Sequence, residues 1–129
     1  LYKSKAKNLI ATCQILVDRY HGEVPREFDQ LVELPGVGRK TANVVVSVLF
    51  GTPAIAVDTH VFRVSNRLKL GIAKTPEEME QKLQKAIPKK DWAAAHHWLI
   101  YHGRRLCKAR KPLCNECFLN HLCPSAGKV

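Results

Sequence analysis

Four of the five cysteines lie close together near the end of the sequence, where they could bind a metal. Cys107, Cys114, Cys117 and Cys123 follow the spacing C-x6-C-x2-C-x5-C. Disulfides fit this pattern poorly, because a chain of 129 residues can fold without them and shows no secretory feature. Four thiolates suit structural zinc, which usually takes paired C-x2-4-C knuckles. They also suit an iron–sulfur cluster, which one such knuckle and two flanking cysteines can surround. The spacing alone leaves both metal sites open.

A second candidate site is the glycine-rich stretch Leu34-Pro-Gly-Val-Gly-Arg-Lys-Thr-Ala42. Gly36 and Gly38 allow the backbone to turn sharply and to approach a partner closely. The amides of residues 36–40 are expected to face outward at the start of a helix, which is a site for anions. Val37 can pack between the helices on either side of the turn. On a basic chain, this helix-hairpin-helix pattern favours contact with DNA phosphates over an ordinary turn between helices.

Two charged side chains could carry catalysis. Lys40 lies in the first turn of the second hairpin helix, where the helix dipole disfavours a cation. The same positive potential favours the neutral amine that a nucleophile needs, although Lys40 taken alone is better explained as a phosphate contact or a solvated side chain. Asp58 can cap a helix, and a carboxylate fixed there could also stabilise a developing cation. Spacing in the sequence does not show whether the two side chains meet.

The periodicity of apolar residues and the helix-ending residues predict an all-α fold with short connections that must position these groups. The first three expected helices are 2–20, ended by Gly22; a short helix with Pro25 in its first turn that carries Phe28, Leu31, Val32 and Leu34; and 39–50, ended by Gly51. The other three are 59 to about 70 with Asp58 as N-cap, a helix from the capping box Thr75-Pro-Glu-Glu78 to before Pro88, and a last helix from Trp92, capped by Asp91. The β-branched run Val44-Val-Val46 is assigned to a helix, because its segment is longer than a typical buried strand. Cys13 falls on the apolar face of the first helix and is expected to be a buried structural thiol.

The composition is that of a globular protein, with 46% hydrophobic and 25% charged residues. The longest apolar run, residues 42–50, is too short to span a bilayer, and the first ten residues contain three lysines and no signal-peptide pattern. The 21 Lys and Arg exceed the 11 Asp and Glu, which gives a net charge of +10 and favours a polyanionic partner. The basic charge is densest in residues 101–129.

Three motifs, in this order, resemble the endonuclease III family of helix-hairpin-helix DNA glycosylases. They are Leu34-Pro-Gly-Val-Gly-Arg-Lys-Thr-Ala-Asn-Val44, Ala56-Val-Asp-Thr-His-Val-Phe-Arg63 and the cysteine spacing. The resemblance implies a base-excision-repair glycosylase with AP lyase activity that removes oxidised pyrimidines from duplex DNA. It implies that Lys40 attacks C1′ of the damaged nucleotide and forms a Schiff base that leads to β-elimination. Asp58 would assist Lys40 and stabilise the oxocarbenium-like sugar. The branch of the superfamily that acts on adenine mismatches usually has no lysine at this position, so Lys40 favours a glycosylase with lyase activity over that branch.

The resemblance also implies ligands and partners. The cysteines Cys107, Cys114, Cys117 and Cys123 would hold a [4Fe-4S] cluster, and the backbone carbonyls of Val32, Leu34 and Val37 would hold Na+ or K+ at the hairpin. Residues expected to contact DNA are Gly36, Val37, Gly38, Arg39, Lys40, the basic tail residues Lys108, Arg110 and Lys111, and Leu1, which would wedge into the base stack. We expect a monomer that binds damaged duplex DNA and no membrane, located at the nucleoid in the cytoplasm if the source is bacterial.

The family's helical domain has further helices before the segment with which this chain starts. Residues 1–57 are therefore expected to be the C-terminal part of a six-helix domain, with the helix-hairpin-helix at about 25–50. Residues 58–129 would form further helices and a cluster lobe with its loop at 107–123. We expect exposed apolar residues among Leu9, Ile10 and Val44, and a chain that is unstable or inactive alone. The alternatives to an enzyme are a non-catalytic helix-hairpin-helix DNA-binding module with a structural metal site and a zinc-stabilised scaffold.

Overall fold

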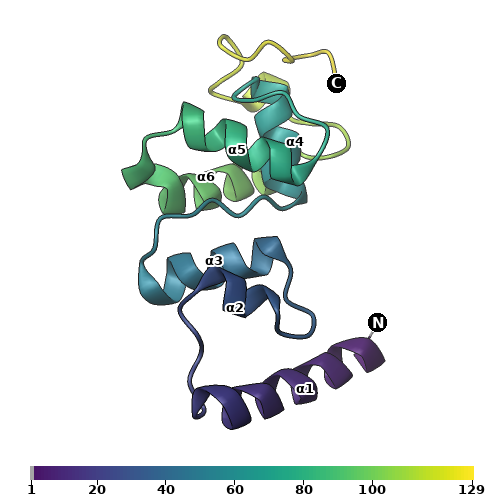
Figure 1. The fold of residues 1–129 in the computed structure, drawn as a ribbon. Coiled ribbons are helices and arrows are strands. Elements are labelled where there is room, and N and C mark those ends of the chain that lie inside the picture. Colours follow the sequence, from purple (N-terminus) through teal and green to yellow (C-terminus); the bar gives the residue numbers. More distant parts are fainter. Residues whose placement is uncertain (1) are drawn as a thin grey trace. The chain divides into compact units, whose positions relative to one another are not determined.

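The computed structural model describes residues 2–129, which contain six α-helices, two short 3-10 helices and no strand (Figure 1). The elements are α1 (Tyr2–Tyr20), α2 (Phe28–Val32), α3 (Arg39–Phe50), α4 (Thr59–Leu68), α5 (Pro76–Ala86), η1 (Lys89–Asp91), α6 (Trp92–Arg105) and η2 (Cys114–Glu116). The all-α prediction is confirmed. None of the helices within residues 2–129 has the length and apolar character needed to cross a membrane. The chain divides into two compact units, Leu1–Thr52 and Pro53–Val129.

Most helix ends follow the residues that predicted them. Helix α3 has the expected bounds and ends at Gly51, whose φ of 66° lies in the left-handed region that closes a helix. The run Val44-Val-Val46 is helical, as predicted. Thr75 caps α5 by accepting a hydrogen bond from the N–H of Glu78 over 3.2 Å. Local signals of this kind are sufficient to define these helices.

Three helix ends differ from expectation. Helix α2 begins at Phe28, so that Pro25 precedes the helix instead of lying in its first turn. Its first helical hydrogen bond runs from the N–H of Leu31 to the carbonyl oxygen of Glu27. Helix α4 ends at Leu68, because Lys69 adopts a left-handed φ of 58°. Asp91 occupies the N-cap of α6 but its side chain makes no capping hydrogen bond, since η1 runs directly into α6 at this point.

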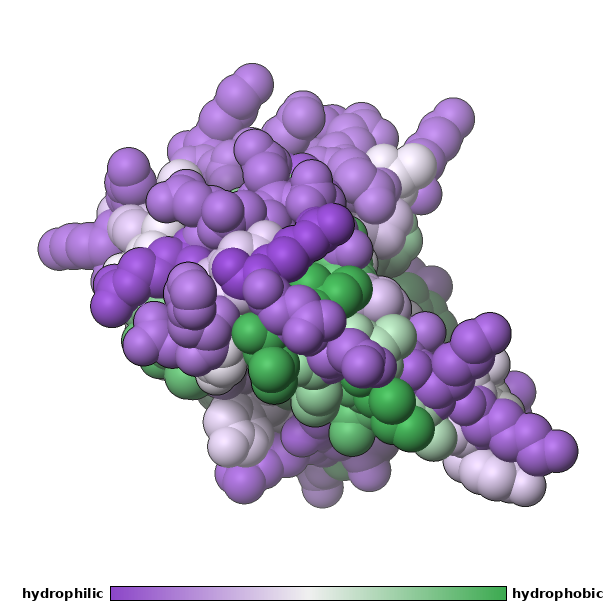
Figure 2. Space-filling model, turned by 60° about the horizontal axis from the view of Figure 1, so that its bottom comes forward, coloured by the Kyte–Doolittle hydropathy of each residue, from purple (hydrophilic) through white to green (hydrophobic). Residues whose placement is uncertain are grey.

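In the first unit, α2 packs against α3 (Figure 1), and the buried residues include Leu31, Leu34, Ala42 and Val46. Helix α1 has no buried residue. Its apolar side chains Leu9, Ile10 and Val17 are between 66% and 70% exposed, which confirms the expectation for the first two, whereas Val44 in α3 is half-buried. Figure 2 shows hydrophobic side chains exposed among hydrophilic ones on the face where α1 comes forward.

The prediction that Cys13 is a buried thiol is wrong, because its side chain is exposed on α1. An apolar stripe predicts burial only when a second element covers it. Within the first unit, Cys13 lines an open groove with the hairpin residues Pro35, Gly36 and Val37, which leaves its side chain exposed.

The second unit has the larger core, built by the segment 53–57 and the helices α4, α5 and α6. Its buried side chains include Ile55, Val57, Val61, Val64, Met79, Leu83 and Leu99. Asp58 caps α4, since its Oδ1 accepts a hydrogen bond from the N–H of Val61 over 2.7 Å. Helices α4 and α6 approach closely at Gly103, and the carbonyl of Gly103 accepts a hydrogen bond from Nη2 of Arg63 over 3.0 Å.

Replacing Gly103 with alanine is expected to cost about 1–3 kcal/mol in crowding, which gives a net destabilisation of up to about 2 kcal/mol once the helical preference of alanine is included. The added Cβ would lie 3.1 Å from Cγ2 of the buried Val64 and 3.2 Å from Cβ of His60, and neither atom is the free end of a flexible side chain. This crowding outweighs the gain of about 1 kcal/mol that alanine brings to a helix interior. Urea unfolding followed by circular dichroism measures the change, and an unchanged or higher midpoint would contradict the close approach of α4 and α6.

Two substitutions of Asp58 separate its capping role from its charge. Asp58→Ala is expected to lower the free energy of unfolding by about 1–2 kcal/mol, because the N–H of Val61 loses its acceptor. Asp58→Asn keeps a side-chain oxygen at the cap and is expected to cost less than about 0.5 kcal/mol. Differential scanning calorimetry compares the two variants, and an equal loss in both would show that the charge, rather than the cap, stabilises α4.

Candidate functional site

The turn between α2 and α3 is held by contacts from α1. Gly36 has a left-handed φ of 79°, and a Cβ at this position would lie 3.0 Å from Nδ2 of Asn8. Oγ1 of Thr12 donates a hydrogen bond to the carbonyl oxygen of Pro35 over 3.0 Å. Sequence reasoning missed both contacts, although two polar residues four apart on α1 would lie on one side of a helix. The hairpin therefore depends on α1 as well as on its own glycines.

One of the amides expected to face outward is used inside the turn. The N–H of Val37 donates to the carbonyl oxygen of Leu34 over 3.1 Å. This amide closes the turn, which corrects the expectation that it faces a partner. The proposed cation site on the carbonyls of Val32, Leu34 and Val37 stays a prediction.

Lys40 lies in the first turn of α3, and its side chain is exposed. The N-cap of this helix is Gly38, which has no side chain to accept hydrogen bonds from the first turn. The start of α3 therefore presents backbone N–H groups that suit an anion beside the amine of Lys40. The neighbouring Arg39 places its guanidinium 5.0 Å from the centre of the Phe28 ring, which joins α3 to α2.

The carboxylate of Asp58 is held from two sides at the start of α4. Besides the cap to the N–H of Val61, its Oδ2 lies 3.4 Å from Nδ1 of His60, and the side chain is only 17% exposed. The preceding residues Ala54–Val57 are buried, and Nδ1 of His96 lies 2.8 Å from the carbonyl oxygen of Ala56. A partly buried carboxylate with fixed orientation can stabilise positive charge that develops next to it. His60 was missed as a contact of this carboxylate, although it lies two residues further on in the same motif.

Lys40 belongs to the first unit and Asp58 to the second, so the surroundings of each are described within its own unit. That the two side chains act together stays a prediction. Leu1, the expected wedge residue, lies outside the described residues.

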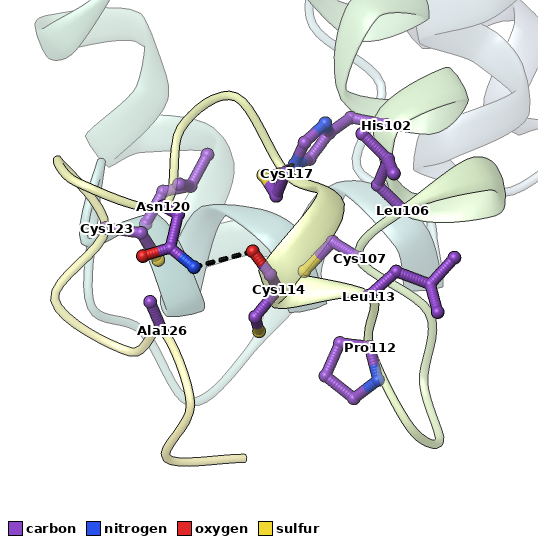
Figure 3. Close-up of a pocket in the computed structure, with 11 residues that line it drawn as sticks. His102, Leu106, Cys107, Pro112, Leu113, Cys114, Cys117, Asn120, Cys123 and Ala126 are labelled. Carbon is purple, nitrogen blue, oxygen red and sulfur yellow. Dashed lines mark hydrogen bonds between the residues drawn. The ribbon is translucent and has the colours of Figure 1, made fainter.

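All four clustered cysteines line one cavity (Figure 3). The cavity has a volume of about 330 Å³ including its mouth, and its other lining residues are Leu68, His102, Leu106, Pro112, Leu113, Asn120 and Ala126. Within residues 2–129, no three Cys, His, Asp or Glu side chains form a ligand group for a single metal ion. Four thiols that line one cavity fit a group that binds several thiolates at once, such as an iron–sulfur cluster.

The loop that carries the cysteines has little regular structure and is held by specific hydrogen bonds. Nδ2 of Asn120 donates to the carbonyl oxygen of Cys114 over 2.6 Å (Figure 3). The N–H of Cys107 donates to the carbonyl of His102, at the end of α6, over 2.9 Å. Burial lowers the pKa of His102. The loop is thus anchored to α6 and closed on itself.

The basic residues of this loop, Lys108, Arg110 and Lys111, are all exposed. Exposed cations next to a cavity of four thiols suit contact with phosphate groups. Their contact with DNA stays a prediction.

Two family models match the chain. Residues 1–89 match the HhH-GPD superfamily base excision DNA repair protein, and residues 107–123 match the iron–sulfur binding domain of endonuclease III. The second match confirms the iron–sulfur interpretation of the cysteine spacing over zinc. The assignment of each thiol as a ligand stays a prediction.

Similar proteins are longer than this chain. Endonuclease III of Rickettsia conorii is 56% identical over 95% of the chain, and endonuclease III of Escherichia coli strain K12 is 53% identical over the whole chain. A solved structure of a trapped endonuclease III–DNA covalent intermediate matches 97% of the chain with a TM-score of 0.92 and 55% identity. The chain spans 59% to 61% of the length of these proteins. Because the first family model covers residues 1–89 of 129, the chain belongs to the HhH-GPD superfamily of base excision DNA repair proteins.

Proposed function

We propose that this chain forms part of a DNA glycosylase with AP lyase activity, which removes oxidised pyrimidines from damaged duplex DNA. The observation that carries the proposal is an exposed lysine amine at the start of α3, where Gly38 provides no side-chain cap. A nucleophile at a site that attracts phosphate would be delivered to the sugar–phosphate backbone. One similar structure is a trapped endonuclease III–DNA covalent intermediate, and a covalent bond to DNA requires such a nucleophile.

In the proposed reaction, the lone pair of the neutral Nζ of Lys40 attacks C1′ of the damaged nucleotide. The bond from C1′ to the base breaks, and the base leaves with the electron pair and takes up a proton. The nitrogen loses a proton, and the bond from C1′ to the ring oxygen then breaks. That oxygen keeps the electron pair and takes up a proton, while the lone pair of the nitrogen forms the C1′=N double bond of a Schiff base on Lys40. Removal of a proton from C2′ then expels the 3′ phosphate, which is the lyase step.

Asp58 has the electrostatic role in this scheme. As the base leaves, the sugar gains oxocarbenium character, and a carboxylate whose orientation is already fixed stabilises that charge without reorganising. The hydrogen bond from the N–H of Val61 and the contact with His60 provide this fixed orientation. Asp58 would also favour the loss of a proton from Lys40.

Duplex DNA is the proposed partner, and two sets of groups would bind its phosphates. The start of α3 contributes backbone amides of Gly38, Arg39 and Lys40, and the loop contributes the side chains of Lys108, Arg110 and Lys111. A net charge of +10 supports this partner. We also propose that the protein acts as a monomer.

The thiols of Cys107, Cys114, Cys117 and Cys123 would hold the [4Fe-4S] cluster. When bound, the cluster supplies four iron–thiolate bonds that fix a loop with little regular structure. The loop would then present its basic residues in one arrangement. We further propose that residues 1–57 belong to a six-helix domain that includes the hairpin, and that residues 58–129 form the cluster lobe. The similar proteins are bacterial, which supports a location at the nucleoid in the cytoplasm.

Borohydride trapping tests the enzyme proposal. Incubated with abasic duplex DNA and borohydride, the chain joined to the part of the Escherichia coli relative that it does not span should form a covalent adduct. Lys40→Gln is expected to abolish the adduct, and Asp58→Asn to slow its formation by about 100-fold or more. Lys85→Gln removes the same charge from the end of α5 and should leave trapping unchanged. Undiminished trapping in Lys40→Gln would contradict the assignment of Lys40 as the nucleophile. DNA binding by the unsubstituted protein without any adduct would favour the non-catalytic DNA-binding module.

Metal analysis tests the ligand set. The protein purified without oxygen is expected to be brown, with iron and sulfide in equal amounts, because cubane clusters contain both. Replacing any one of the four cysteines with serine should lower the iron content, whereas Cys13→Ser should leave it unchanged, since Cys13 lies on α1 in the other unit. A colourless protein that contains zinc would contradict the cluster.

A further inference from the structure

We propose that Arg67 of α4 and His102 of α6 are positioning residues for the iron–sulfur cluster, which act by donating N–H···S hydrogen bonds to Cys107 and Cys117. The two bonds would retain the cluster and raise its reduction potential. The proposal rests on the cysteine ligands proposed above and is independent of the glycosylase activity.

Arg67 holds the start of the cysteine loop with its guanidinium. Nη1 lies 3.4 Å from Sγ of Cys107 and donates to the carbonyl oxygen of Lys108 over 2.7 Å. Nη2 donates to the carbonyl oxygen of Ala109 over 3.1 Å. A planar guanidinium can satisfy these three acceptors together, because its N–H groups lie in one plane with fixed directions.

The backbone of the same residue holds the end of the loop. The carbonyl oxygen of Arg67 accepts a hydrogen bond from Oγ of Ser125 over 2.7 Å and lies 3.8 Å from Sγ of Cys123. The first and last cysteines of the cluster motif therefore both lie against Arg67. This residue fixes the separation between the two ends of the loop.

His102 provides the second contact to sulfur, from another helix. Its Nε2 lies 3.7 Å from Sγ of Cys117, and its ring lines the cysteine cavity (Figure 3). The ring of Phe118 meets the ring of His102 edge to face, with 5.9 Å between the ring centres. Phe118 therefore packs against the imidazole whose Nε2 lies beside the sulfur.

Hydrogen bonds to cluster sulfurs have a known physical effect. An N–H donor withdraws electron density from the sulfur and stabilises the more negative, reduced cluster, which raises the reduction potential. The positive charge of Arg67 acts in the same direction. Residues that orient metal ligands also increase retention, and their loss typically lowers metal affinity by about 10–100-fold.

The test compares iron-loaded variants that remove these donors with a control variant that removes a nearby charge but no contact with sulfur. His102→Phe keeps a ring against Phe118 but has no N–H, and Arg67→Lys keeps the charge but cannot reach all three acceptors. Arg105→Gln removes a charge two residues from Cys107, where the guanidinium lies 5.3 Å from the Tyr101 ring centre and not on a sulfur. Circular dichroism confirms that each variant is folded, and His102→Phe carries the test alone if Arg67→Lys does not fold.

The measurements are the midpoint potential of the cluster by voltammetry and the rate of iron release to a chelator. We expect a lower potential for His102→Phe and iron release about tenfold faster for both variants. For Arg105→Gln we expect the wild-type release rate and a smaller change in potential than for His102→Phe. Wild-type potential and release rates in both variants would overturn the proposal, as would an equal shift in Arg105→Gln. A wild-type protein that binds no iron would contradict both the ligand assignment and this proposal. If the wild-type protein binds iron and the variants keep its potential and release rate, only this proposal is contradicted.

Discussion

The hydrogen bond from the N–H of Val61 to the carboxylate of Asp58 fixes the start of α4, and much of the second unit depends on that helix. From the same helix, Arg63 donates to the carbonyl oxygen of Cys107 over 3.2 Å, and Arg67 contacts the loop beyond it. The helix therefore connects the proposed catalytic carboxylate at its first turn to the cysteine loop at its last. A displacement of α4 would move both the carboxylate and the residues that hold the loop.

Glycine residues allow two close contacts between helices and neighbouring backbone on which the candidate sites depend. At Gly36 the left-handed backbone brings the hairpin turn against Asn8 of α1, and at Gly103 the missing side chain lets α6 approach α4. The second approach also brings the carbonyl of Gly103 within reach of Arg63. The hairpin and the cysteine loop are thus both supported by a neighbouring helix rather than by their own residues alone.

Helix boundaries were predictable from the sequence because caps and stops act within a few residues. Gly51, Asp58 and Thr75 each define a helix end through a local backbone or side-chain geometry. The exposure of Cys13 was not predictable, since it depends on what covers α1. The contacts of Arg67 and His102 with sulfur were not predictable either. Arg67 and Cys107 are 40 residues apart, and a local sequence pattern does not indicate a contact between residues so far apart. The cysteine spacing indicated a cluster, but not the residues that surround it.

The central claim is that the amine of Lys40 forms the covalent bond to DNA. Peptide mapping by mass spectrometry of the borohydride-reduced adduct tests it most directly, because it identifies the modified nitrogen. We expect a sugar-derived mass on the peptide that contains Lys40 and on no other lysine. A modification on a different lysine, or on the amino terminus, would contradict the assignment even if the protein cleaved abasic DNA.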